Sequence, residues 1–193
     1  SEMQNAVVAL DGKTIRRSQS EKHRAFHIET AYLSDMQIVL GQVAIDEKSN
    51  EITAIPKLLE MLALQKCTVT IDAIGTHESI AKAVRNTGAE YILPVKENQS
   101  TMLDDIRFYA ENEIFTVRHS VLAEENRYAV QNDKGHGRIE KRECYLFDSA
   151  DWLKEQYHWT DLHGVAVIRS TRTMINTGET STYDRYFIYS HTE

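Results

Sequence analysis

Two aspartates that each follow an unbroken apolar run are the residues of this sequence most suggestive of chemistry. Val7–Leu10 leads into Asp11, and a β-branched run from Cys67 to Ile71 leads into Asp72. Apolar runs of this length are typical of strands buried on both faces of a sheet. A carboxylate at the end of such a strand needs a cation, a hydrogen-bond cluster or a metal ion as its partner. The pair is therefore a candidate metal site, although each aspartate could equally cap the backbone of a local turn.

The chemistry that such a pair could support is phosphoryl transfer on DNA or RNA. This reaction uses carboxylates that hold two metal ions about 3.5–4 Å apart. Magnesium prefers hard oxygen ligands and keeps several waters, so two or three acidic side chains are enough to bind it. We therefore expect Mg²⁺ or Mn²⁺ as the cofactor if Asp11 and Asp72 meet in the fold.

Other motifs that the same residues suggest are incomplete. Gly12-Lys13-Thr14 resembles the end of a phosphate-binding Walker loop, but that motif needs a glycine where Val7 stands. An aspartyl-phosphate phosphatase would need an acid at position 13, which is Lys13. No Cys and His spacing suits zinc. The polar stretch Gly135–Glu140 is as consistent with a glycine-rich hairpin as with a site.

Composition limits the class of protein. The chain has 193 residues, 41% of them hydrophobic and 26% charged, which suits one core or one core with an insertion. It has no apolar run long enough to cross a membrane and no signal-peptide pattern, and its two cysteines fit a reducing cytoplasm. The net charge of −7 argues against nucleic-acid binding by the whole surface. A local basic stripe remains compatible with it.

The periodicity of the first half predicts three meandering strands followed by alternating helices and strands. We expect strands over residues 7–11, 25–33, 37–45, 67–72 and 90–96, and helices over 55–64, 77–86 and 101–112. Pro56 would lie in the first turn of its helix, and Ser100 would cap the third. The order β-β-β-α-β-α-β-α resembles that of the ribonuclease H-like α/β fold, a mixed sheet in which the first and fourth strands are neighbours. Asp11 and Asp72 would then meet.

The second half changes character from Phe115 onward. Polar turns such as Asn176-Thr177-Gly178 separate strand-like segments, which we expect over residues 118–122, 138–147, 164–173 and 182–190. No linker precedes them, so the chain is interpreted as a core over residues 1–114 with a β-rich insertion of the same domain over 115–193. The basic segment Arg16–Arg24 is either a solvated hairpin or a loop that faces phosphates.

Several stretches, taken together, carry a family resemblance that spans nearly the whole chain. They are residues 11–17 (DGKTIRR), 40–43 (LGQV), 47–56 (EKSNEITAIP), 70–73 (TIDA) and 134–140 (KGHGRIE). They resemble the H-repeat-associated (ISAs-type) group of bacterial insertion-sequence DDE transposases. The resemblance implies metal-dependent cleavage and transfer of DNA strands, with transposon ends as the DNA partner and two metal ions in the complete enzyme. A homodimer is compatible with it.

By this resemblance Asp11 and Asp72 are the first two catalytic acids and metal ligands. Residues that follow the fifth strand are expected to face the same rim and to position a phosphate, with a solvated strand end as the alternative. The candidate nucleic-acid-binding residues are Arg16, Arg17, Lys96, Asn98, Gln99, His136 and Arg138.

The third acid of the family is a glutamate on a helix that follows a strand resembling Arg185–Ser190. We expect it beyond Glu193, and the family also has a helical region ahead of its first aspartate. With two acids only, the 193-residue chain is expected to bind cations weakly or not at all and to be nearly inactive. Glu140 belongs to the insertion and is a less favoured substitute for the missing acid. The alternative is a degenerate, non-catalytic remnant that binds DNA or protein.

Overall fold

The computed structural model describes residues 5–15, 26–34, 36–45, 51–116, 127–148 and 150–192. The chain divides into two compact units. The first unit comprises residues 1–94, 158–162 and 190–193, and the second comprises residues 95–157 and 163–189. The division into a core and an insertion at residue 114 stays a prediction.

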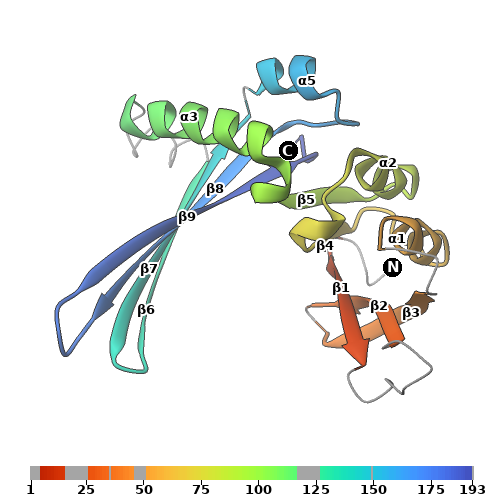
Figure 1. Ribbon diagram of the computed structural model, residues 1–193, viewed down its shortest axis with the longest axis horizontal. Coiled ribbons are helices and arrows are strands. Elements are labelled where there is room, and N and C mark those ends of the chain that lie inside the picture. The colour runs from red at the N-terminus through yellow and green to blue at the C-terminus, as the bar shows by residue number, and fades with distance from the viewer. Residues whose placement is uncertain are drawn as a thin grey trace. The chain divides into compact units, whose positions relative to one another are not determined.

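The first unit contains a mixed sheet with strand order β3-β2-β1-β4-β5 (Figure 1). Strands β1 to β3 form the predicted antiparallel meander, whereas β1, β4 and β5 run parallel to one another. The strand bounds are β1 Val7–Ile15, β2 Phe26–Leu33, β3 Ile38–Ile45, β4 Thr68–Ile71 and β5 Glu90–Val95.

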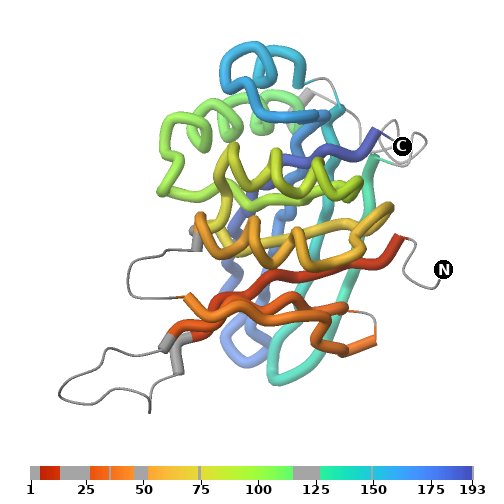
Figure 2. Tube along the Cα trace, turned by 90° about the vertical axis from the view of Figure 1, so that its right-hand side faces the viewer, coloured from red at the N-terminus to blue at the C-terminus, as the bar shows by residue number. Residues whose placement is uncertain are grey.

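Two helices cover one face of this sheet. Figure 2 shows α1 (Glu51–Glu60) and α2 (Glu78–Asn86) on the same side of the strands. The side chains of Leu10 and Ile71 point to this face and are at most 5% exposed. Period-two alternation along β1 and β4 explains this burial, because every second residue faces the helices. The intervening residues, including Asp11, lie on the opposite face.

The second unit contains four antiparallel strands in the order β9-β8-β7-β6. In Figure 1 helix α3 lies across one end of these strands, and the hairpin tips extend away from it. Tyr109 of α3 packs against Phe147 and Trp152, with ring centroids 5.9 and 5.4 Å apart. The bounds are η3 Glu97–Gln99, α3 Ser100–Thr116, β6 Tyr128–Gly135, β7 Arg138–Phe147, α5 Asp151–Tyr157, β8 Gly164–Met174 and β9 Thr180–Tyr189.

The predicted fold class is confirmed. The first eight major elements follow the order β-β-β-α-β-α-β-α, and β1 and β4 are neighbours, as in a ribonuclease H-like sheet. The strand predicted over residues 138–147 is β7 with the same bounds. The turn at Asn176-Thr177-Gly178 is also present, and Gly178 takes the positive φ of 72° that such a turn favours. None of the described helices is long and apolar enough to cross a membrane.

Several boundaries were wrong. Helix α1 begins at Glu51, so Pro56 lies inside it, because the buried side chains of Ala54 and Ile55 extend the packed face toward the N-terminus. Ser100 is the first residue of α3 and not the residue before it, since η3 leads directly into the helix. Strand β6 and helix α5 were not predicted. The strand expected over residues 118–122 lies outside the described residues.

Candidate active site

Asp11 and Asp72 each directly follow the last residue pair that joins the parallel strands β1 and β4. The register pairs Leu10 of β1 with Ile71 of β4; Asp11 is the next residue of β1, and Asp72 is the first residue after β4. Strand β1 continues to Ile15 in pairing with β2, so the prediction that Asp11 ends its strand was wrong. Neighbouring strands are about 4.8 Å apart. That the two carboxylates share one cation stays a prediction.

Each aspartate also has a local partner. The Oδ2 atom of Asp11 lies 3.4 Å from Nζ of Lys13, and both side chains are more than half exposed. The Oδ1 atom of Asp72 accepts a hydrogen bond of 2.6 Å from the backbone N–H of Ala73, at the start of the 3₁₀ helix η2 (Ala73–Gly75). Asp72 therefore does cap local backbone, and the same bond orients its carboxylate at the end of β4.

The face that carries the aspartates also carries His191. Alternation places Thr68 and Asp72 on one face of β4, and Thr68 pairs with Val7 of β1. The Nε2 atom of His191 lies 3.0 Å from Oγ1 of Thr68. Thr68 is four residues from Asp72, which corresponds to about 13 Å along a strand. The chain that follows β9 is thus held on the face of the candidate site.

An ionic network holds this terminal segment in place. Ser190 donates a hydrogen bond of 2.6 Å to Glu90, whose other carboxylate oxygen lies 2.5 Å from Arg85. Arg85 also donates to Asp161 at 2.9 Å. Burial alone would raise the pKa of the Glu90 carboxyl, but the hydrogen bonds from Arg85 and Ser190 outweigh it and lower that pKa. The network ties residues 161 and 190 to β5.

This anchoring predicts a pH dependence of stability. Burial lowers the pKa of His191 from its ordinary value of 6.5, against the opposing charge of Glu90. The unfolded chain therefore takes up a proton at a higher pH than the folded chain, so the free energy of unfolding falls as the pH drops below about 6.5. We expect urea unfolding at about pH 7.5 and about pH 5.5 to show a smaller fall for His191→Gln than for the parent chain.

A matched control is the exposed His136, which lies in the turn between β6 and β7. His136→Asn removes one exposed histidine and keeps a residue that tolerates the positive φ of this position. An equal fall in His191→Gln and the parent chain would contradict the assignment.

The other candidate residues that the structure describes lie in separate elements. Lys96 and Asn98 are exposed at the start of η3, and Gln99 is half-buried there. These three belong to the second unit, so their approach to Asp11 stays a prediction. His136 lies at the tip of the β6–β7 hairpin, which favours the hairpin interpretation of that stretch, and Arg138 begins β7. Arg16 and Arg17 lie outside the described residues.

Glu140 is engaged elsewhere. Its buried carboxylate contacts Arg142 at 3.1 Å, Arg172 at 3.5 Å and Arg138 at 3.7 Å. Burial would raise the pKa of Glu140, but the charges of Arg142 and Arg172 reverse that effect and the pKa is lowered. Three guanidinium groups around one carboxylate oppose the approach of a metal cation. Glu140 is therefore poorly suited to complete a metal site.

The described part of the chain contains no cluster of three or more His, Cys, Asp or Glu side chains that could hold a metal ion.

Comparison with known proteins decides the family. The profile of a family described as "Transposase DDE domain" matches residues 2–184. The chain belongs to this transposase DDE family. It is 36% identical over 172 residues to the "H repeat-associated putative transposase YhhI" of Escherichia coli (strain K12), with 88% of this chain and 44% of that protein covered. This relative supports membership of the H-repeat-associated group.

Two further relatives have the same pattern of partial coverage. An "Uncharacterized protein in dhlA 3'region" of Xanthobacter autotrophicus is 39% identical, covering 96% of this chain and 60% of that protein. The "H repeat-associated putative transposase YbfD" of Escherichia coli (strain K12) is 36% identical, covering 76% of this chain and 56% of that protein. This chain thus spans 44–60% of the length of these three relatives.

Sequence reasoning missed the partners of Glu140 and of Glu90. Arg172 lies 32 residues after Glu140 and meets it only through the register of β7 and β8. The alternation Arg138-Glu140-Arg142 was the available signal, because residues two apart in a strand share a face. No local pattern links Glu90 to Ser190, which are 100 residues apart.

Proposed function

We propose that this chain is the segment of a DDE transposase that supplies the first two catalytic acids for cleavage and transfer of DNA strands. The observation that carries the proposal is the parallel register of β1 and β4, in which Leu10 pairs with Ile71 and each is directly followed by an aspartate, Asp11 and Asp72. The family supports DNA as the substrate.

The donor set fits a hard divalent cation. Asp11 and Asp72 offer exposed carboxylate oxygens, which are the ligands that Mg²⁺ and Mn²⁺ prefer. When bound, such ions activate an attacking water or 3′-hydroxyl and stabilise the leaving oxygen of a phosphodiester. The N–H of Ala73 keeps Asp72 oriented, and Lys13 neutralises Asp11 until a cation replaces it. Pairing with Thr30 of β2 fixes the backbone of Asp11.

His191 lies at Thr68, at the other end of β4 and about 13 Å along the strand from Asp72, so it is not proposed as a ligand. Lys96, Asn98, Gln99, Arg16 and Arg17 remain proposed phosphate contacts, and Lys96→Ala should weaken DNA binding.

The test is cleavage of supercoiled plasmid by the purified chain with Mn²⁺. We expect very slow nicking, because loss of one acid weakens cation binding and each ~1.4 kcal/mol of lost transition-state stabilisation costs tenfold in rate. Asp11→Asn and Asp72→Asn should each remove the residual nicking. Nicking that survives both substitutions would refute the assignment.

Robust nicking that is lost in Asp72→Asn would instead show that an acid within the chain completes the site. Glu140, which three arginines surround, is the less favoured candidate for that acid. The competing function is a non-catalytic DNA- or protein-binding module, which the lack of a third acid among the described residues favours. Binding of DNA without any Mn²⁺ bound at Asp11 and Asp72 would support it.

A further inference from the structure

One face of the β6–β9 sheet carries an excess of arginines. The antiparallel register assigns cross-strand partners to the same face, and alternate residues along each strand share it. By this rule a single face carries four guanidinium groups and only two carboxylates, those of Asp133 and Glu140. We call this set the arginine face, and its basic members are Arg138, Arg142, Arg172 and Arg185.

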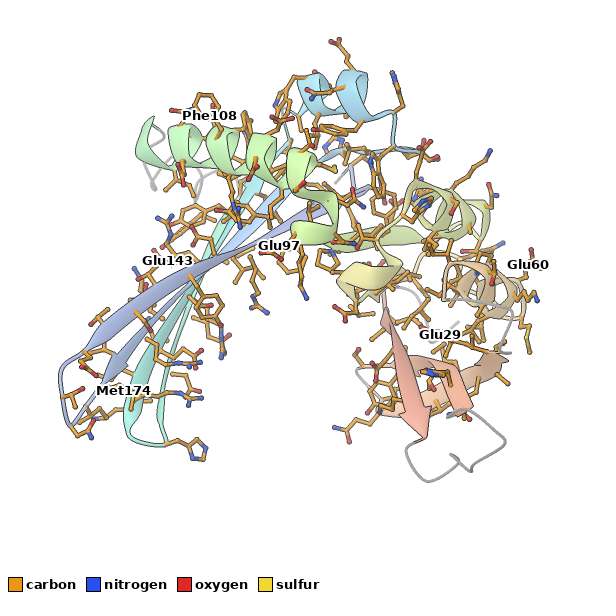
Figure 3. All side chains as sticks on the ribbon, in the orientation of Figure 1. Glu29, Glu60, Glu97, Phe108, Glu143 and Met174 are labelled. Carbon is orange, nitrogen blue, oxygen red and sulfur yellow. The ribbon has the colours of Figure 1, made fainter. Side chains whose placement is uncertain are left out.

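The four arginines stand in successive cross-strand rows. Arg138 pairs with Met174, Glu140 with Arg172, Arg142 with Ser170, and Ile168 with Arg185. Met174, labelled in Figure 3, marks the row nearest the hairpin tips. Successive rows are about 6.8 Å apart, so the arginine face extends roughly 20 Å along the strands. A DNA duplex carries one charge per about 1.7 Å of helix axis, so a face of this length can contact several phosphates of one duplex.

Glu140 contacts three of these arginines but cannot accept hydrogen bonds from all of their N–H groups. Each guanidinium has five N–H donors, and a single carboxylate accepts only a few hydrogen bonds. Arg138, Arg142 and Arg172 remain 37%, 40% and 37% exposed around it. The cluster therefore has donors left for an external anion.

The opposite face of the same strands lacks this surplus at its ion pairs. Lys141 contacts Glu143, labelled in Figure 3, at 2.8 Å. Arg169 donates two hydrogen bonds of 2.9 and 2.7 Å to the carboxylate of Asp184. There each carboxylate pairs with one basic side chain, whereas three arginines share Glu140 on the arginine face.

We propose that the arginine face binds the phosphate backbone of duplex DNA, with Glu140 as the residue that positions its guanidinium groups. This proposal rests on the proposed function, which makes DNA the substrate. Arginine suits the role because its planar fork matches phosphate oxygens. The face supplies a local basic surface in a chain whose net charge is −7. It holds the duplex without reading sequence, since phosphate contacts position and base contacts specify.

The test is fluorescence anisotropy of a labelled duplex with the full chain over a series of salt concentrations. Arg138→Gln/Arg185→Gln removes the two arginines on which Glu140 depends least. We expect roughly a 100-fold loss of affinity at low salt, tenfold per charged contact, and a decrease of about 1.8 in the slope of log K against log salt. The matched control Lys57→Gln/Lys82→Gln removes two exposed charges on helices α1 and α2, and it should change both quantities far less.

Three outcomes would overturn the proposal. They are equal losses in the test and control variants, displacement of DNA by polyglutamate at the same charge concentration, and absence of DNA binding by the parent at low salt. Binding of Mn²⁺ to Asp11 and Asp72 does not require these arginines. A chain that binds Mn²⁺ but fails the DNA test therefore refutes the arginine face and leaves the proposed function standing.

Discussion

Replacing Asp72 by asparagine is expected to abolish stabilisation of the chain by Mn²⁺ without lowering its stability in EDTA. Asparagine is as good a helix cap as aspartate, so the hydrogen bond from Ala73 is retained. The substitution removes one of two negative charges at equivalent positions of β1 and β4, and like charges so placed repel each other. The thermal midpoint in EDTA should therefore stay the same or rise.

The stabilisation by Mn²⁺, in contrast, should be lost in Asp72→Asn. A ligand that binds only the folded state stabilises it by RT ln(1 + [L]/Kd), so Mn²⁺ should raise the midpoint of the parent chain. Loss of one carboxylate ligand should weaken Mn²⁺ binding by at least about tenfold, or ~1.4 kcal/mol. The midpoint of Asp72→Asn should then be insensitive to millimolar Mn²⁺. Differential scanning calorimetry with and without Mn²⁺ measures both effects.

Asp104→Asn is the matched control, because Asp104 is an exposed aspartate on α3 that pairs with Arg107 at 3.3 Å. It should keep the full response to Mn²⁺. If Asp72→Asn keeps that response as well, the cation binds elsewhere and the proposed site is wrong. If the variant is instead less stable in EDTA by several degrees, Asp72 is a structural cap whose charge matters to folding.

The first unit was largely predictable because its burial is periodic. Unbroken apolar runs at Val7–Leu10 and 67–71 identified two inner strands, and the element order then implied that β1 and β4 are neighbours. The start of helix α1 was predicted wrongly. Pro56 suggested a helix start, because the residue before a proline disfavours the helical conformation. Burial of Ile55 at 1% exposure shows that packing against the sheet overrides this preference.

The second unit was less predictable, because strand pairing and not local sequence pattern determines much of it. Strand β6 is exposed along almost its whole length, so its residues have no apolar alternation to detect. It exists because it pairs with β7 through a tight turn, in which His136 and Gly137 have φ values of 49° and 74°. The contacts of Glu140 depend on the register of β7 and β8, which follows from pairing and not from local pattern. The candidate aspartates were found because each directly follows a detectable run.

Replacing Gly75 by alanine is expected to weaken metal binding although Gly75 carries no ligand. A Cβ at Gly75 would overlap Cγ2 of Ile71 and lie 3.1 Å from Cδ1 of Ile55. Ile71 is the last residue of β4 and precedes Asp72, so relief of this overlap must move η2 or the end of β4. Overpacking of this kind costs about 1–3 kcal/mol. At about 2 kcal/mol the thermal midpoint should fall by roughly 4–8 °C for a chain of this size.

Gly135→Ala provides the comparison, because a Cβ there would meet nothing within 4 Å. Alanine in an exposed strand should be neutral or slightly stabilising, and it should leave the Mn²⁺ response unchanged. The informative result is a variant Gly75→Ala that is still folded by circular dichroism but whose midpoint no longer rises with Mn²⁺. A Gly75→Ala chain that loses stability and keeps the full Mn²⁺ response would show that η2 does not position Asp72.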